Sequence, residues 1–163
     1  QENGSVEAAN YNAQGQVVIA GATAAVEAVM SLAKENGGKA ISLPVSVPSH
    51  CSMMKPAAEK LATALDQVSI SPPQIAVIHN VDVSVHQQPA AIKKALIEQL
   101  FRPVRWHESV TRFQEYGVTD VIECGPGKVL AGLVKRIDKA LVCSNIFDFD
   151  SLQKTSEMMG VVE

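Results

Sequence analysis

The chain has 163 residues, of which 47% are hydrophobic, 19% charged and 4% aromatic, and its formal net charge is −3. The length suffices for a buried core, while the scarce aromatic side chains, the negative charge and the lack of a basic run argue against a nucleic-acid partner. No segment resembles a membrane span or a signal peptide, and three widely spaced cysteines favour reduced thiols, so we expect a cytoplasmic protein that binds no membrane.

The first part of the chain predicts a strand–helix–strand unit. Residues 16–20 form a short β-like run, and residues 22–36 carry apolar side chains at helical spacing until Gly37 and Gly38 end the pattern. Residues 40–47 then read as a second strand. The polar segment 10–15 ahead of the first strand is typical of a turn.

The second part repeats the alternation of helices and strands. The pattern predicts helices over 53–68, from Pro89 onward, over 106–116, from Val129 onward and over 150–159, with strands over 75–79, 118–124 and 140–145. Strands that alternate with helices predict an α/β protein with a largely parallel sheet.

His50 is the candidate catalytic residue, because an apolar extended run ends there and a helical pattern begins a few residues later. In α/β enzymes, catalytic and binding side chains often lie where a strand ends and a helix follows. This position alone makes a structural role for His50 as plausible as a catalytic one. The neighbours Ser49 and Cys51 are poor partners, since adjacent residues in extended chain point to opposite faces, and we expect Cys51 to be a packed side chain. No Gly-x-Ser-x-Gly segment occurs in the sequence, so this chain offers a base without its nucleophile.

Two other patterns suggest weaker alternatives. The segment from Gly125 to Lys128 resembles a phosphate loop, but its glycines are too close and Val129 replaces the hydroxyl residue, which favours a tight turn with Lys128 in solvent. The remaining histidines (His79, His86 and His107) lack the spacing of metal ligands, so we expect no metal site and ordinary polar roles.

Five segments, taken in order, resemble the C-terminal half of the bacterial malonyl-CoA:acyl-carrier-protein transacylase family. They are NYNAQGQVVIAG (10–21), LPVSVPSHCSMMKPAA (43–58), NVDV (80–83), QLFRPVRW (99–106) and ECGPGKVL (123–130). The resemblance covers nearly the whole chain and is weakest after residue 146. It implies an acyltransferase that moves malonyl groups from malonyl-CoA to acyl carrier protein in fatty acid biosynthesis, with no cofactor.

The resemblance also implies a two-part architecture. Residues 1–47 correspond to the latter part of a small ferredoxin-like subdomain, and residues 48–163 to the C-terminal part of a large α/β-hydrolase-like acyltransferase subdomain. In this family the small sheet is antiparallel, which conflicts with the parallel sheet that the strand pattern alone predicts for the first region.

The same resemblance assigns roles to individual residues. His50 matches the general base that deprotonates a serine nucleophile and later the incoming thiol. Gln99 matches the residue whose backbone carbonyl orients the imidazole, and Asn10 and Asn12 match positions near the substrate cleft. Ser49 is uninformative about the acyl group.

The departures from the family pattern concern the N-terminal half. The serine nucleophile, the oxyanion-hole glutamine and the arginine that pairs with the malonyl carboxylate all belong to that half, and the chain begins Gln-Glu-Asn-Gly without methionine. We therefore expect a segment of a longer protein, inactive alone, whose apolar surface is covered by the missing N-terminal half or by self-association. A catalytically incompetent fragment or carrier-protein-binding module is the alternative, and a nucleotide-binding domain ranks last.

Overall fold

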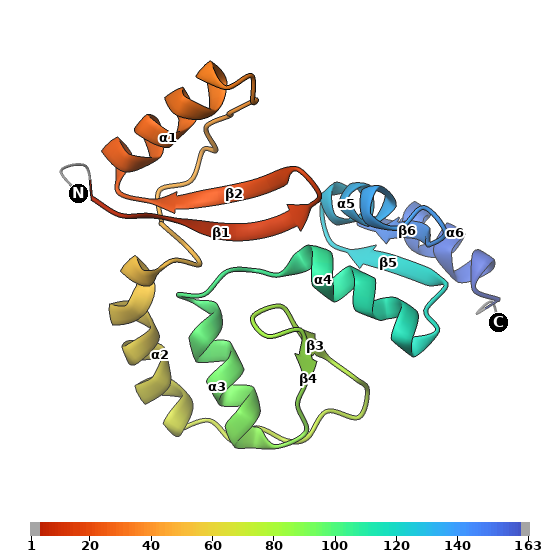
Figure 1. Ribbon diagram of the computed structural model, residues 1–163. Helices are drawn as coiled ribbons and strands as arrows, with labels where there is room; N and C mark the ends of the chain where they lie inside the picture. The colour runs from red at the N-terminus through yellow and green to blue at the C-terminus, as the bar shows by residue number, and fades with distance from the viewer. Residues whose placement is uncertain (1–3, 161–163) are drawn as a thin grey trace. The chain divides into compact units, whose positions relative to one another are not determined.

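The computed structural model describes residues 4–160 and shows a mixed α/β fold (Figure 1). The chain forms two compact units, which divide between Trp106 and His107. The predicted subdomain boundary at residues 47 and 48 lies inside the first unit and remains a prediction.

The first unit begins with an antiparallel hairpin of strands β1 (Val6–Ala13) and β2 (Gln16–Gly21), drawn in red and orange in Figure 1. Helix α1 (Thr23–Glu35) follows and packs against β2. Strand β1 was missed in the sequence because its asparagines suggested a turn, whereas the turn is confined to Gln14 and Gly15. Gly15 makes that tight connection possible with a φ of 73°.

The predicted strand over residues 40–47 is wrong. Within residues 4–160 no strand pairs with this segment, which is irregular. Its alternating apolar side chains are all exposed: Ile41 by 67%, Leu43 by 51%, Val45 by 72% and Val47 by 51%. The alternation is that of a strand with one buried face, but a strand forms only where a partner completes its ladder of hydrogen bonds.

The remainder of the first unit contains a helix pair and a small hairpin. The 3₁₀ helix η1 (Ser52–Met54) leads into helix α2 (Lys55–Asp66), which packs against helix α3 (Pro89–Gln99). In the sequence between these two helices, β3 (Ile78–His79) pairs antiparallel with β4 (Ser84–Val85). The predicted strand over 75–79 is therefore reduced to its last two residues.

The second unit contains the parallel pair that the sequence predicts. Its elements are α4 (Trp106–Thr111, whose first residue belongs to the first unit), η2 (Arg112–Tyr116), β5 (Asp120–Cys124), α5 (Val129–Ile137), β6 (Val142–Ile146) and α6 (Phe149–Met158). Strands β5 and β6 run parallel, and α5 connects them and packs against both (Figure 1). The expectation of a largely parallel sheet is therefore wrong for β1–β2 and β3–β4, because hairpins connect those pairs directly.

Candidate active site

His50 lies in a turn between the irregular segment and η1, not at the strand end that the sequence suggested. Its backbone adopts a left-handed conformation with a φ of 65°. Histidine reaches this region more readily than most residues with a Cβ, but the conformation persists only where the surroundings determine it.

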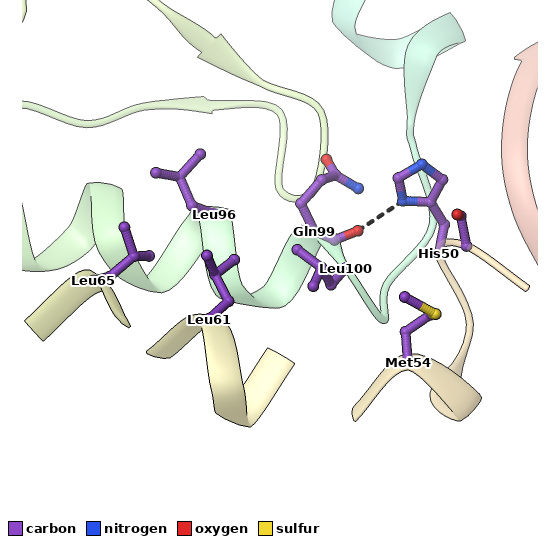
Figure 2. Close-up of a pocket in the computed structure, with 8 residues that line it drawn as sticks. His50, Met54, Leu61, Leu65, Leu96, Gln99 and Leu100 are labelled. Carbon is purple, nitrogen blue, oxygen red and sulfur yellow. Dashed lines mark hydrogen bonds between the residues drawn. The ribbon is translucent and has the colours of Figure 1, made fainter. Parts of the chain in front are cut away.

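The C-terminal end of α3 holds His50 through two consecutive carbonyls, and Figure 2 shows the contact with Gln99. The backbone N–H of His50 donates to the carbonyl of Leu100 at 2.9 Å, and the imidazole Nδ1 lies 2.7 Å from the carbonyl oxygen of Gln99. The last carbonyls of a helix lack partners within the helix, so His50 satisfies two acceptors that would otherwise need water.

The contact with Gln99 fixes the tautomer of the ring. A carbonyl oxygen can only accept, so Nδ1 must carry the hydrogen and Nε2 is left with its lone pair. This arrangement suits a general base whose reactive atom is Nε2.

The carbonyl of Gln99 is itself held in place by the turn after α3. The side-chain Nε2 of Gln99 donates to the carbonyl of Arg102 at 3.2 Å, and Arg102 pairs with Glu98 at 2.7 Å. The backbone N–H groups of Phe101 and Arg102 both donate to the carbonyl of Glu98. The carbonyl that contacts the imidazole is therefore part of an internally bonded turn.

A hollow of about 320 Å³ lies beside the imidazole, between α2 and α3. Four leucines dominate its wall, as Figure 2 shows, and the lining residues are Ser49, His50, Met54, Leu61, Leu65, Leu96, Gln99 and Leu100. His50 and Gln99 thus lie at the polar end of an otherwise apolar hollow.

The residues beside His50 in the sequence are not its hydrogen-bond partners. Cys51 is only 1% exposed, and its Sγ donates to the carbonyl of Pro48 at 3.1 Å, which confirms the prediction of a packed side chain. Within the described part of the chain, neither Ser49 nor Cys51 bonds to the imidazole.

Asn10 and Asn12 lie on the second half of β1. Asn10 also forms a parallel bridge with Val104, because Tyr11 N–H donates to the Val104 carbonyl and Val104 N–H to the Ala9 carbonyl, each at 2.9 Å. The hollow beside His50 is lined by neither asparagine, so their predicted place near the substrate remains a prediction.

His79 and His86, for which the sequence predicts ordinary polar roles, lie close to each other and to Asp82. His86 Nε2 lies 2.8 Å from the carboxylate of Asp82, and the rings of His79 and His86 are 5.2 Å apart. Burial, and then the nearby His86, lower the pKa of His79 below its ordinary value. Asp82 and His86 are four positions apart, and this spacing could have indicated their contact from the sequence. Within residues 4–160 no group of side chains is arranged to bind a metal ion.

The loop from Gly125 to Lys128 does not form a phosphate cradle. The carboxylate of Glu123 already accepts the N–H groups of Leu130 at 3.1 Å and Ala131 at 2.8 Å at the start of α5. An anion-binding position at this helix terminus is therefore filled by the protein's own carboxylate. Lys128 is exposed, with its Nζ 5.7 Å from the centre of the Phe147 ring.

The sequence profile of the acyl transferase domain family matches residues 2–147. The chain belongs to this family. Among curated relatives, the malonyl CoA-acyl carrier protein transacylase of Haemophilus influenzae is 48% identical over 98% of this chain and 51% of its own length. No helix within residues 4–160 has both the length and the apolar character needed to cross a membrane.

Solved structures of acyl transferases agree with this membership. The acyl-carrier-protein S-malonyltransferase of Burkholderia pseudomallei superimposes with a TM-score of 0.91 at 52% identity, over 96% of this chain and 51% of that one. A malonyl-transacylase in complex with a type II PKS acyl-carrier protein gives a TM-score of 0.92 at 47% identity, over 95% of this chain and 50% of that one. The chain therefore spans about half the length of the relatives it matches.

Proposed function

We propose that this chain supplies the general base of a malonyl-CoA:acyl-carrier-protein transacylase, with His50 as the base and Gln99 as its orienting residue. The observation that carries the proposal is the 2.7 Å contact between His50 Nδ1 and the Gln99 carbonyl, in a chain of the acyl transferase family. It leaves Nε2 free to accept a proton.

In the first half-reaction, Nε2 takes the proton of a serine hydroxyl outside this chain as the oxygen attacks the malonyl thioester. The C–S bond breaks, coenzyme A leaves as its thiol with the proton from His50, and a malonyl ester remains on the serine. In the second half-reaction, Nε2 takes the proton of the carrier protein's phosphopantetheine thiol. The sulfur attacks the ester, and the serine oxygen regains the proton as it leaves.

A carbonyl is a weaker orienting group than the carboxylate of a Ser-His-Asp triad. It suffices here because a thioester is already activated, so the reaction demands less of the base. Within this proposal Asn10 and Asn12 border the substrate, and no metal or redox cofactor takes part.

The subdomain assignment belongs to the same proposal. Residues 1–47 form the latter part of a small ferredoxin-like subdomain, an idea that the antiparallel β1–β2 hairpin supports. Residues 48–163 form part of the α/β-hydrolase-like subdomain, supported by the parallel β5–β6 pair and its connecting helix.

The missing partner is an N-terminal half that carries the serine. Two observations support it: the chain spans about half of its relatives, and the alternating apolar side chains of residues 41–47 are exposed. An additional strand beside this segment would bury that face and complete its ladder. Within this proposal the enzyme is cytoplasmic, which the free thiols of Cys51, Cys124 and Cys143 support.

The experiment that tests this function measures transfer of labelled malonyl from malonyl-CoA to holo acyl carrier protein. By the natural protein we mean this chain together with the proposed N-terminal half. We expect malonyl transfer by the natural protein and no stable malonyl adduct on residues 1–163 alone. A covalent malonyl adduct on the isolated chain would overturn the assignment of the nucleophile to the other half, and a natural protein without transfer would favour the incompetent binding module.

A further inference from the structure

We propose that Glu7 is a positioning residue for His50, which holds the turn that carries the base. The proposal rests on the function proposed above, but its structural part can be tested separately. Glu7 lies in β1, 43 positions from His50, outside every segment that points to catalysis.

The carboxylate of Glu7 binds the residue that follows the turn. Its two oxygens accept the backbone N–H of Ser52 at 3.2 and 3.3 Å, and one also accepts the Ser52 hydroxyl. Ser52 is the first residue of η1, where the backbone N–H groups have no partner within the helix. Glu7 therefore fixes the backbone two residues after His50.

These contacts complete a closed path of hydrogen bonds and short backbone segments that begins and ends on β1. Ala9 and Tyr11 of β1 pair with Val104, the segment before Val104 leads back to the end of α3, and the Leu100 and Gln99 carbonyls bind His50. Glu7 then joins Ser52 back to β1. His50 is thus tied from both sides to one strand within the first unit.

The left-handed backbone of His50 explains why this tie matters. With a φ of 65°, the residue has no intrinsic preference for its conformation, and its surroundings must impose it. The α3 carbonyls hold the N–H and the ring of His50, and Glu7 holds the chain that leaves it. Without Glu7 the turn can relax, and the imidazole then loses its fixed distance to Gln99.

The test compares Glu7→Ala, Glu7→Gln and Ser52→Pro in the natural protein. Glu7→Gln keeps an acceptor at the same length. Ser52→Pro removes both Ser52 donors without changing Glu7, and proline fits there because Cys51 is extended, with φ −132° and ψ 170°, at the start of a helix. Asp148→Ala is the matched control, since it removes a carboxylate that accepts the N–H of Ser151 at 2.8 Å at another helix start.

Two readouts separate positioning from stability. The first is kcat and KM for malonyl transfer, and the second is the NMR resonance of the His50 Nδ1–H in protein labelled with ¹⁵N-histidine, assigned by its loss in His50→Ala. We expect Glu7→Ala and Ser52→Pro to lower kcat on the order of 10- to 100-fold, to change KM by less than about threefold, and to weaken the resonance. Glu7→Gln and Asp148→Ala should leave the kcat for malonyl transfer and the His50 resonance close to those of the wild-type protein.

A Glu7→Ala protein with an unchanged resonance, or with a rate no lower than Asp148→Ala, would overturn the proposal. If Glu7→Ala does not fold, the same two criteria apply to Ser52→Pro: an unchanged resonance, or a rate no lower than that of Asp148→Ala, would overturn the proposal. A wild-type protein without malonyl transfer would refute the proposed function alone, because the resonance would still report whether Glu7 holds His50.

Discussion

His50 and Gln99 lie 49 positions apart, yet the imidazole Nδ1 and the Gln99 carbonyl oxygen are 2.7 Å from each other. The bond uses main chain on the Gln99 side, at a helix end where carbonyls need a partner. The side chain of Gln99 has a different task, which is to hold the turn after α3 through Arg102.

Gln99→Ala should therefore be a mild substitution. It preserves the backbone carbonyl and removes one exposed hydrogen bond to Arg102, so we expect kcat/KM for malonyl transfer to fall by less than about tenfold. A loss as large as that of His50→Ala would show that the side chain, and not the carbonyl, orients the base.

The three cysteines should react with a maleimide in a fixed order. Cys124 is exposed, Cys143 is partly buried and burial raises its thiol pKa, and Cys51 is 1% exposed. Because the thiolate is the reactive form, mass spectrometry of the labelled chain should show Cys124 first, Cys143 later and Cys51 last. Labelling of Cys51 as fast as Cys124 would contradict the described packing.

His79 should make the folded state less stable in mild acid. Its pKa is lowered in the folded chain, mainly by burial and next by His86. As the pH falls below the ordinary histidine pKa of about 6.5, His79 binds a proton in the unfolded chain but not yet in the folded chain. The free energy of unfolding therefore decreases. The decrease ends once the pH passes the lowered folded-state pKa.

His79→Gln should remove this part of the pH dependence. Urea unfolding of both proteins between pH 7.5 and about 5 gives the comparison, because the difference between the two curves isolates His79 from the carboxylates. Parallel curves over that range would show that His79 does not contribute.

The core of the second unit should be sensitive at Val134, whose side chain is fully buried in α5. Val134→Ala deletes two buried methyl groups and should lower the free energy of unfolding by about 1–3 kcal/mol. Val142→Ala is the control, because Val142 is 51% exposed and its loss should cost less than about 0.5 kcal/mol. Equal losses in urea unfolding would contradict the described core.

Local patterns predicted much of this fold. The helical stripes predicted α1, α2 and α6 close to their observed bounds and α3 and α5 from their first residues, and the alternation around Gly125 predicted the parallel β5–β6 pair. The segment 40–47 was predicted as a strand because its apolar residues alternate, and the prediction failed because strand formation depends on a partner far away in the sequence.

The candidate site shows the same division between local and distant information. The histidine and its neighbourhood were indicated by the sequence, while Gln99 came only from the family resemblance, since a backbone carbonyl has no sequence signature. Glu7 had no signal at all, because its role depends on the approach of β1 to the turn after His50. The spacing of Asp82 and His86 was a local signal for their contact, whereas the approach of His79 to His86 depends on the pairing of β3 with β4.

The most direct test of the central claim is the rate of malonyl transfer to holo acyl carrier protein by His50→Ala in the natural protein, with and without added imidazole. A general base contributes on the order of 10² to 10⁴ in rate, so we predict a loss of that size and partial recovery with free imidazole. A His50→Ala protein that transfers malonyl at nearly the wild-type rate would contradict the account and leave His50 a structural residue.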